Sequence, residues 1–130
     1  MTELVVFCLD ELRIALRLTA VERVVRAVQV TRLPQAPEIV LGVINLQGRA
    51  IPIVDFRNRF HLGRREPRIT DQMIIARTAR RPVGLMADAV DPECPRDFGH
   101  ATLEITPSLA REMQPEVPRH EGAQFGQQRL

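Results

Sequence analysis

The sequence has 130 residues, 45% of them hydrophobic, and a formal net charge of +2 at pH 7. One domain of this length can bury roughly two-thirds of its unfolded surface, and an apolar fraction dominated by Val, Ile and Leu without Trp or Tyr predicts an all-β fold. The eighteen basic residues are all arginine and are interspersed with acidic ones, which argues against a nucleic-acid-binding face, and no apolar run approaches the roughly twenty residues that cross a bilayer.

The first predicted element is a β-hairpin over residues 4–18. Residues 4–9 form an apolar run, and residues 12–18 alternate between large apolar side chains and Arg or Ala. Such a period of two is typical of a strand with one buried face and one face in water. Cys8 falls within the first apolar run, so we predict that it is a small core residue rather than a redox or metal group.

Residues 19–28 have two possible interpretations. Thr19 and Glu22 have the spacing of a helical capping box, and the valines from Val21 to Val28 recur at helical intervals. A segment this rich in valine nevertheless favours extended structure, because β-branched side chains lose rotamer freedom in a helix. The residues alone leave helix and strand open.

The central stretch, residues 42–57, has the densest run of apolar and turn residues and predicts a second hairpin. Apolar residues lead into and out of a turn at Gln47 and Gly48, where glycine accepts the positive φ of a tight turn. Pro52 lies within the second strand and has no N–H to donate. We therefore expect it to face a free edge or a bulge.

The second half of the chain is predicted to contain a third hairpin. An exposed polar loop over residues 61–70 precedes this hairpin at residues 71–90, in which Gly84 marks a bulge or a point of close packing. Residues 103–105 supply an eighth short strand. Alternation ends at residue 107, so residues 107–130 are predicted to be a poorly ordered or atypical tail.

Residues suited to catalysis or metal binding are few. His61, His100 and His120 lie in loop-like segments, and no Ser or Cys stands beside one of them with an orienting acid. Cys94 and His100 are too few for a metal site and are predicted to be solvated. Asp55 is interpreted as an acid that caps or pairs with the following turn, rather than as a nucleophile or base. We expect no enzyme activity, no cofactor and no metal.

The central hairpin carries a family resemblance. Its order of Gly-Val-x-Asn-Leu-x-Gly from Gly42, followed by a Pro-Ile-Val-Asp strand and Arg57, resembles the CheW-like domain, the coupling module of bacterial chemosensory arrays. The resemblance extends over residues 5–90. Members of the family usually have Arg where this chain has Gln47, and Glu where it has Arg23.

The resemblance implies two small SH3-like five-stranded barrels packed together within residues 1–106, with one helical turn near residues 19–22 followed by a strand. The family normally ends in an apolar strand pair that closes the second barrel, whereas residues 107–130 have no alternating apolar run. We therefore expect an incomplete second barrel that exposes apolar side chains of residues 73–75 and 85–90. A strand swapped from a second copy as a dimer, a strand donated by a partner, and a truncated chain of low stability are the three alternatives.

The resemblance also implies a function and partners. The protein would be a non-catalytic adaptor that binds the hairpin tip of a chemoreceptor in the groove between the barrels and the regulatory domain of a sensor histidine kinase at a barrel end. We expect it in the cytoplasm, at membrane-associated receptor arrays. The alternative is a stand-alone β-barrel module that binds acidic peptides or nucleic acid. The family's partner contacts fall on Val21, Arg23, Gly42, Asn45, Gln47 and Gly48.

Overall fold

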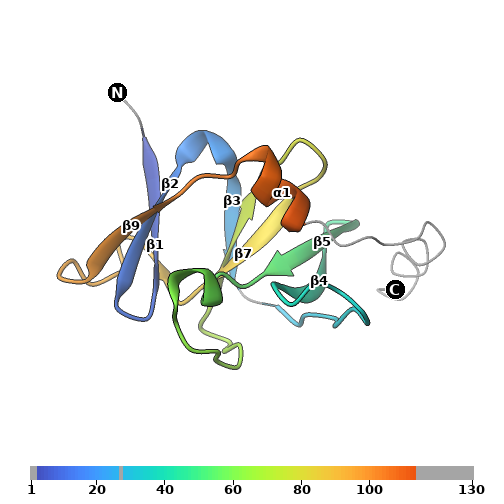
Figure 1. The fold of residues 1–130 in the computed structure, drawn as a ribbon, viewed down its shortest axis with the longest axis horizontal. Helices are drawn as coiled ribbons and strands as arrows, with labels where there is room; N and C mark the ends of the chain where they lie inside the picture. Colours follow the sequence, from blue (N-terminus) through green and yellow to red (C-terminus); the bar gives the residue numbers. More distant parts are fainter. Residues whose placement is uncertain (1–2, 27, 114–130) are drawn as a thin grey trace.

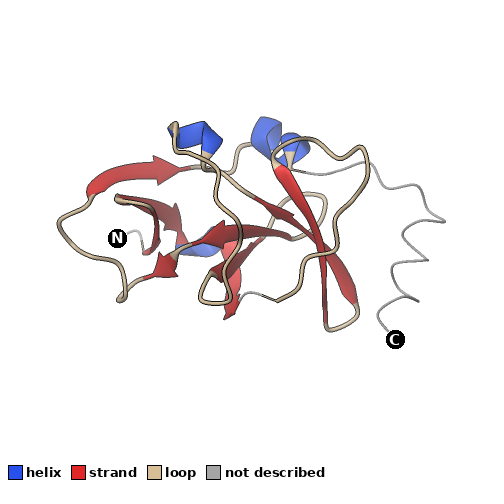
Figure 2. Cartoon of the chain, turned by 90° about the horizontal axis from the view of Figure 1, so that it is seen from below, coloured by secondary structure: helices blue, strands red, loops and turns tan. Residues whose placement is uncertain are grey.

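The computed structural model describes residues 3–26 and 28–113, and β-strands dominate this part of the chain, with only short helical segments between them (Figures 1 and 2). The predicted all-β class is confirmed. The strands are β1 (Leu4–Leu9), β2 (Leu12–Arg17), β3 (Val21–Arg26), β4 (Val40–Leu46), β5 (Arg49–Val54), β6 (Gln72–Ala76), β7 (Val83–Ala87), β8 (Ala89–Val90) and β9 (Gly99–Leu103). The helices are the 3-10 helices η1 (Leu18–Ala20) and η2 (Asn58–Phe60) and the α-helix α1 (Pro107–Glu112).

The central hairpin is formed by β4 and β5, as predicted, and a two-residue turn joins the strands. Gln47 (φ 51°) and Gly48 (φ 86°) both have positive φ, as in the type I′ turn, whose twist matches that of the flanking strands. The Asn45 side chain supports the turn, because its Oδ1 accepts a hydrogen bond from the backbone N–H of Gly48 at 3.1 Å.

Pro52 lies opposite Val43 in the β4–β5 ladder. The backbone N and O of Val43 bond to Thr31 on the other side of β4, at 2.8 Å each. The Val43–Pro52 pair is therefore a non-hydrogen-bonded one, and the Pro52 nitrogen faces away from β4. On that far side β5 pairs with β7 only from Ile53 onward. Pro52 thus occupies a position where no donor is needed, in agreement with the predicted free edge.

Five strands form one sheet, in the order β3-β6-β7-β5-β4. Two contacts connect edge strand β3 and the segment after it with the hairpin of β4 and β5 on the other side of the sheet. Thr31, which follows β3 in the chain, pairs with Val43 of β4, and the Glu22 carboxylate of β3 binds the Arg49 guanidinium of β5 at 2.6 Å. These contacts agree with the closed barrel that the resemblance implies.

Strands β6 and β7 form the predicted third hairpin and lie inside the five-stranded sheet. Gly84 is a point of close packing, since a Cβ there would lie 2.3 Å from Cδ1 of Ile53. The prediction that residues 73–75 and 85–90 expose apolar side chains is wrong for β6 and β7, since residues 73–75 and 85–87 are at most 7% exposed. Ala89 and Val90 of β8 are half-buried. Strands β6 and β7 each have a neighbour on both sides and apolar clusters on both faces, so they give no reason to invoke a swapped or donated strand.

The other sheet has four strands, in the order β8-β1-β2-β9. The hairpin of β1 and β2 is present as predicted, with Leu9 opposite Leu12 next to the turn. Strand β9 runs parallel to β2, with Ala101 opposite Ile14, and begins before the position predicted for an eighth strand. Figure 1 shows β1, β2 and β9 together on one side of the molecule and β4, β5 and β7 on the other.

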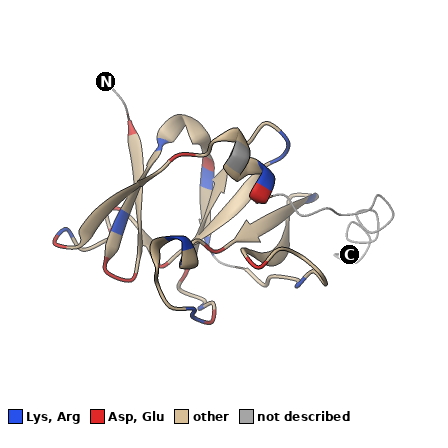
Figure 3. Ribbon diagram, viewed as in Figure 1, with Lys and Arg blue, Asp and Glu red and all other residues tan. Residues whose placement is uncertain are grey.

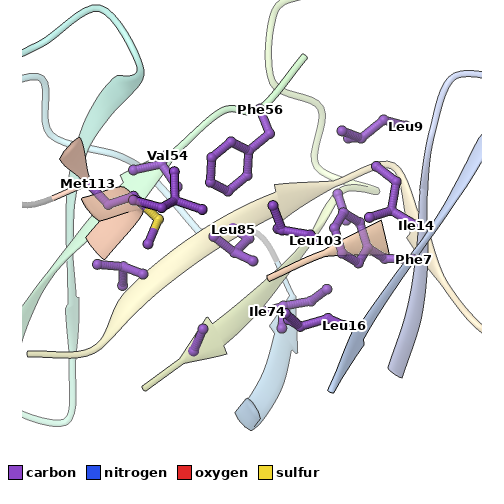
Figure 4. Packing of buried hydrophobic residues seen from close by; sticks show 14 of the residues in the cluster. Phe7, Leu9, Ile14, Leu16, Val54, Phe56, Ile74, Leu85, Leu103 and Met113 are labelled. Atoms are coloured by element: carbon purple, nitrogen blue, oxygen red, sulfur yellow. The ribbon is translucent and has the colours of Figure 1, made fainter. Parts of the chain in front are cut away.

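A large apolar cluster fills the space between the two sheets (Figure 4). Phe7, Ile14 and Leu16 of the four-stranded sheet belong to it together with Ile74 and Leu85 of the five-stranded sheet, and none of the five is more than 1% exposed. Because side chains alternate along a strand, intervening residues of the five-stranded sheet point the other way and form a second cluster. That cluster consists of Ile44, Ile51, Ile53, Met73, Ile75 and Met86.

The segment after β9 differs from the expectation for residues 107–130. Helix α1 begins after Thr106, whose side chain accepts a hydrogen bond from the backbone N–H of Leu109 at 3.1 Å. Leu109 and Met113 are buried in the cluster between the sheets. These residues are four apart, a helical spacing that a search for strand alternation does not detect. Residues 114–130, including His120, lie outside the described part of the chain.

Cys94 is buried, contrary to the prediction of a solvated loop residue. Its thiol donates a hydrogen bond to the backbone oxygen of Ala89 at 3.4 Å. Burial and a side-chain hydrogen bond with Cys8 raise the pKa of Cys94 to about 12. The Arg13 guanidinium fixes this loop, because it donates to the Cys94 carbonyl and to Asp91. Cys8 is a buried core residue, as predicted.

Candidate partner-binding site

The six residues predicted to contact partners lie on β3, β4 and the turn after β4. Val21 and Arg23 are on β3, where a bulge interrupts the pairing with β6 between them. The ion pair of Glu22 with Arg49 brings this part of β3 next to the end of the hairpin. Gly42 lies farther along β4, away from the turn. The structure therefore unites the β3 residues with the turn and places Gly42 apart from them.

Gly42 holds the hairpin against the segment that precedes it. Its φ is 154°, and a Cβ added there would lie 2.2 Å from the backbone oxygen of Thr31. Thr31 is the residue that pairs with β4 and connects the ends of the sheet. We interpret Gly42 as a structural support of the site rather than as a contact residue.

We expect Gly42→Ala to lower the free energy of unfolding by about 1–3 kcal/mol, because the new Cβ would collide with a backbone atom in a conformation that L-residues rarely adopt. Urea unfolding measures this loss. Gly63→Ala is the matched control, since a Cβ at Gly63 meets nothing within 4 Å. Equal stabilities of the two variants would contradict the structural role.

The turn presents a polar, exposed surface formed by Asn45, Gln47 and Gly48. The Asn45 side chain is engaged with the backbone of Gly48, whereas the Gln47 side chain forms no hydrogen bond within the described residues. Gln47 is therefore the turn residue whose side chain is available to a partner. Val21, by contrast, is only 9% exposed and packs into the cluster between the sheets.

Arg23 is half-buried, and two of its guanidinium nitrogens, Nε and Nη2, are covered without having a hydrogen-bond acceptor among the described residues. Its neighbour Glu22 is occupied by Arg49. The hydrogen bond from Arg49 lowers the pKa of the Glu22 carboxyl, and the charges of Arg49, Arg77 and Arg23 lower it further. The positive charges of three arginines thus stabilise the ionised form of the Glu22 carboxylate. Sequence reasoning missed Arg49 and Arg77, because their proximity to β3 depends on how the sheet folds.

A partly buried ionic cluster joins the two sheets at another place. Arg57 donates to Asp88 at 3.1 Å and to Asp10, while Arg65 donates to Asp71 at 2.9 Å and to Asp88. Desolvation opposes ionisation of Asp88, but hydrogen bonds from the Asp10 backbone and from Arg65 prevail and hold the Asp88 pKa below its ordinary value. These ion pairs lie where the two sheets meet, so we assign the cluster a structural role, although Arg65 Nε has no hydrogen-bond partner among the described residues.

The described residues show no arrangement that suggests catalysis. No three His, Cys, Asp or Glu side chains among them gather as metal ligands. Asp55 Oδ1 accepts a hydrogen bond from the Arg57 backbone N–H at 2.9 Å, which supports the interpretation of Asp55 as a structural acid. Within residues 3–26 and 28–113, no helix is long and apolar enough to cross a membrane. Figure 3 shows acidic and basic positions interspersed over the fold.

An apolar groove of about 410 Å³ lies beside the loop that precedes β6. Val28, Leu41, Ile69 and Met86 line it, together with Arg32 and other polar residues. Ile69 is 91% exposed and Val28 is 51% exposed, which is unusual for large aliphatic side chains and is typical of interaction sites. Sequence analysis did not single out this groove, because its wall comes from segments that are distant in the chain.

Comparison with known proteins shows where this fold belongs. The family model of the CheW-like domain matches residues 3–97 of this chain, which is more than half of its length. The chain belongs to the CheW-like domain family. The match covers β1 to β8 and all six predicted contact residues. The resemblance drawn from the central hairpin is therefore confirmed.

Three relatives of this CheW-like chain carry related names. Chemotaxis protein CheW of Rhizobium meliloti (strain 1021) is 39% identical over 88 residues, which are 68% of this chain and 57% of that protein. Probable chemotaxis protein CheW of Rhizobium etli is 29% identical over 120 residues, or 90% of this chain and 74% of that protein. The crystal structure of scaffolding protein TtCheW from Thermoanaerobacter tengcongensis has a TM-score of 0.63 and 37% identity, and the match covers 68% of this chain and 61% of that one.

The CheW-like chain thus spans just over half the length of the Rhizobium meliloti relative. The relative of known structure is named a scaffolding protein, which agrees with the expectation that this chain is not an enzyme.

Proposed function

We propose that this CheW-like chain is a non-catalytic scaffold that couples chemoreceptors to a sensor histidine kinase in chemotaxis. The observation that carries the proposal is the family match over residues 3–97, which includes the whole central hairpin and β3. Two of the relatives are named for chemotaxis, and the third is named a scaffolding protein. A role in binding partners also suits a surface that has exposed polar and apolar sites and no gathered metal ligands among the described residues.

The kinase contact in this proposal is the end of the central hairpin together with the start of β3. The Gln47 side chain is exposed and uncommitted there, and the ion pair of Glu22 with Arg49 holds β3 beside the turn. The hydrogen bond from the Gly48 N–H to the Asn45 side chain holds the turn, which lowers the entropy lost when the turn is immobilised in a complex. Val21 supports the β3 part of this surface because it packs into the cluster between the sheets.

The chemoreceptor contact is proposed for an apolar surface, because receptor hairpins present helices. The groove beside Ile69 and Val28 supports this assignment, since an amphipathic helix buries its apolar face in such a groove. The kinase and receptor contacts would then use separate surfaces of one chain, as a scaffold requires.

We expect this chain to bind the isolated regulatory domain of a chemosensory histidine kinase in isothermal titration calorimetry. Gln47→Arg should change the Kd by less than about tenfold and in the direction of tighter binding, because a guanidinium can pair with a partner carboxylate in two hydrogen bonds. Gln35→Arg adds the same charge at another exposed position and is the matched control. Absence of binding by the unaltered chain would refute the proposed function.

A salt titration separates this function from the alternative of a nucleic-acid-binding module. Affinity for DNA or RNA should be weak and should fall steeply as salt rises, since it would depend on phosphate contacts. Affinity for the kinase domain should depend less on salt. Tight, salt-dependent binding of RNA or DNA without kinase binding would favour the alternative.

A further inference from the structure

We propose that the free edge of β9 pairs with the same edge of a second copy, so that the four-stranded sheets of two chains join into one continuous sheet. Strand β9 is the last strand of its sheet, and no described strand pairs with its outer side. The proposal goes beyond the scaffold function and does not depend on it, because the candidate partner-binding site lies on the other sheet.

The backbone of β9 presents unpaired hydrogen-bonding groups at this edge. Strand β9 runs parallel to β2 with Gly99 opposite Leu12, and the Gly99 N–H donates to the Glu11 oxygen at 3.0 Å. In such a ladder every second residue bonds to the neighbouring strand, so Gly99 and the alternate residues after it turn toward β2. The N–H and C=O groups of His100 and Thr102 therefore point away from β2, where no described strand receives them.

The edge of β9 also lacks the features that keep free strand edges from pairing. Natural proteins protect such edges with short strands, charged side chains, proline or bulges. Strand β8, at the opposite edge of the same sheet, has only two residues. Strand β9 has five residues, pairs with β2 without a bulge, and contains neither proline nor Lys, Arg, Asp or Glu. It is therefore the edge of this sheet that is open to a further strand.

The side chains beside this edge are polar and exposed. Leu103 is buried and Ala101 packs against the cluster between the sheets, so the alternating side chains lie on the outer face. These are His100, Thr102 and Glu104, and all three are exposed. A strand added at the edge would place its own side chains beside them, so this row of residues determines which strand fits.

The row fits a second copy of itself. A twofold axis perpendicular to a sheet makes the two strands that it relates antiparallel. With Thr102 opposite Thr102 of the second copy, His100 of each chain lies opposite Glu104 of the other. Because the backbone groups at these positions point outward, the opposed residues form hydrogen-bonded pairs. An imidazole opposite a carboxylate, twice in one contact, is a complementary arrangement.

The same row argues against neighbouring registers. An axis at His100 would set one histidine against the other, and an axis at Glu104 would set two carboxylates against each other, which destabilises a strand pair. Both registers would also pair fewer residues of β9. The axis at Thr102 is therefore the register that uses the free backbone groups and the charges together.

Sedimentation velocity of the full chain measures the association. We expect a dimer with a Kd on the order of 100 µM, because a strand-edge contact is smaller than a standard interface. Thr102→Pro should weaken the dimer by about tenfold or more, since proline has no N–H to donate, while an outward-facing position leaves the β2 ladder intact. Thr102→Ala is the matched control: it also loses the hydroxyl but keeps the N–H, and the Kd should change by less than about threefold.

Cysteine cross-linking tests the register. Across the axis the two Cα atoms of Thr102→Cys would lie about 5.5 Å apart, within the range of a disulfide. Those of His100→Cys would be about 14 Å apart, which is too far. With oxidised glutathione as the oxidant, Thr102→Cys should form a linked dimer at least about tenfold faster than His100→Cys. Cys8 and Cys94 are buried and do not compete. A mixture of His100→Cys and Glu104→Cys should link one variant to the other.

The outcomes decide the proposal separately from the scaffold function. A chain that stays monomeric at about 500 µM, five times the expected Kd, overturns it and leaves the edge for a strand of a different protein. A dimer that Thr102→Pro leaves unchanged forms through another surface and also overturns it. Equal cross-linking of Thr102→Cys and His100→Cys excludes the register, and this measurement decides the question if Thr102→Pro does not fold. Kinase binding, measured well below the Kd of the dimer, is unaffected by any of these results.

Discussion

Asp88→Ala should lower the free energy of unfolding by about 3–5 kcal/mol, because it removes the carboxylate that Arg57 and Arg65 share. The Arg57 side chain is 6% exposed, so its charge would stay buried with one partner fewer. Desolvation of the remaining charge accounts for most of the expected loss. The cluster also connects the two sheets, so its loss should affect the whole domain.

Chemical denaturation with urea measures this effect. Glu104→Ala is the matched control: its pair with Arg17 at 3.5 Å is 62–66% exposed, and removing an exposed pair should cost between 0 and about 1 kcal/mol. A loss below about 1 kcal/mol for Asp88→Ala would mean that the cluster does not hold the sheets together.

The same carboxylate predicts a dependence on pH. Asp88 has a folded pKa below its ordinary value of 3.8, so the unfolded chain takes up a proton at this group at a higher pH than the folded chain does. Its contribution to stability is therefore complete above the unfolded pKa and is lost as the pH falls through the folded pKa. The stability difference between the unaltered chain and Asp88→Asn should accordingly be constant near neutral pH and shrink below about pH 4.

Ile53→Ala should lower the free energy of unfolding by about 2–5 kcal/mol, close to the total stability of a small domain. Ile53 is fully buried, and its Cδ1 occupies the space that a Cβ of Gly84 would need. Truncation would leave a cavity between β5 and β7, which pair at this point. Loss of these contacts and the cavity itself both contribute.

Ile69→Ala is the control for Ile53→Ala, because it removes the same atoms from a side chain that is 91% exposed. Its effect on unfolding should stay within about 0.5 kcal/mol. Thermal unfolding and urea titration should rank the two variants in the same order. Similar losses for both would show that the hairpin does not contribute to the core.

The sequence predicted the parts of the fold that depend on neighbouring residues. An apolar run located β1, alternation located β2, and the Gln47–Gly48 pair located the central turn. Each of these patterns depends only on residues close together in the chain. The ambiguous valine-rich segment also resolved as the resemblance implied, into η1 and β3. The spacing of the valines favoured a helix there and their β-branched side chains favoured a strand, and the structure agrees with the composition.

The parts that sequence reasoning missed depend on distant residues. Cys94 is buried because Arg13, on a strand of the four-stranded sheet, fixes its loop. Helix α1 is too short for periodicity to stand out, and only its packing against the core shows its role. At the candidate site the turn and Arg23 were predicted, but the unpaired edge of the guanidinium follows from the surroundings of β3 in space.

The order of the sheets has a consequence for how the protein folds. The five-stranded sheet draws on a continuous part of the chain, whereas the four-stranded sheet joins β1 and β2 to β8 and β9, and its contacts Asp10–Asp88 and Arg13–Asp91 connect residues 78 apart. Closing such a long loop costs more entropy than closing a hairpin, and a high contact order slows folding. During synthesis on the ribosome, the hairpin of β1 and β2 emerges first. Its sheet can be completed only after β8 and β9, the last two strands of the described residues, have been made.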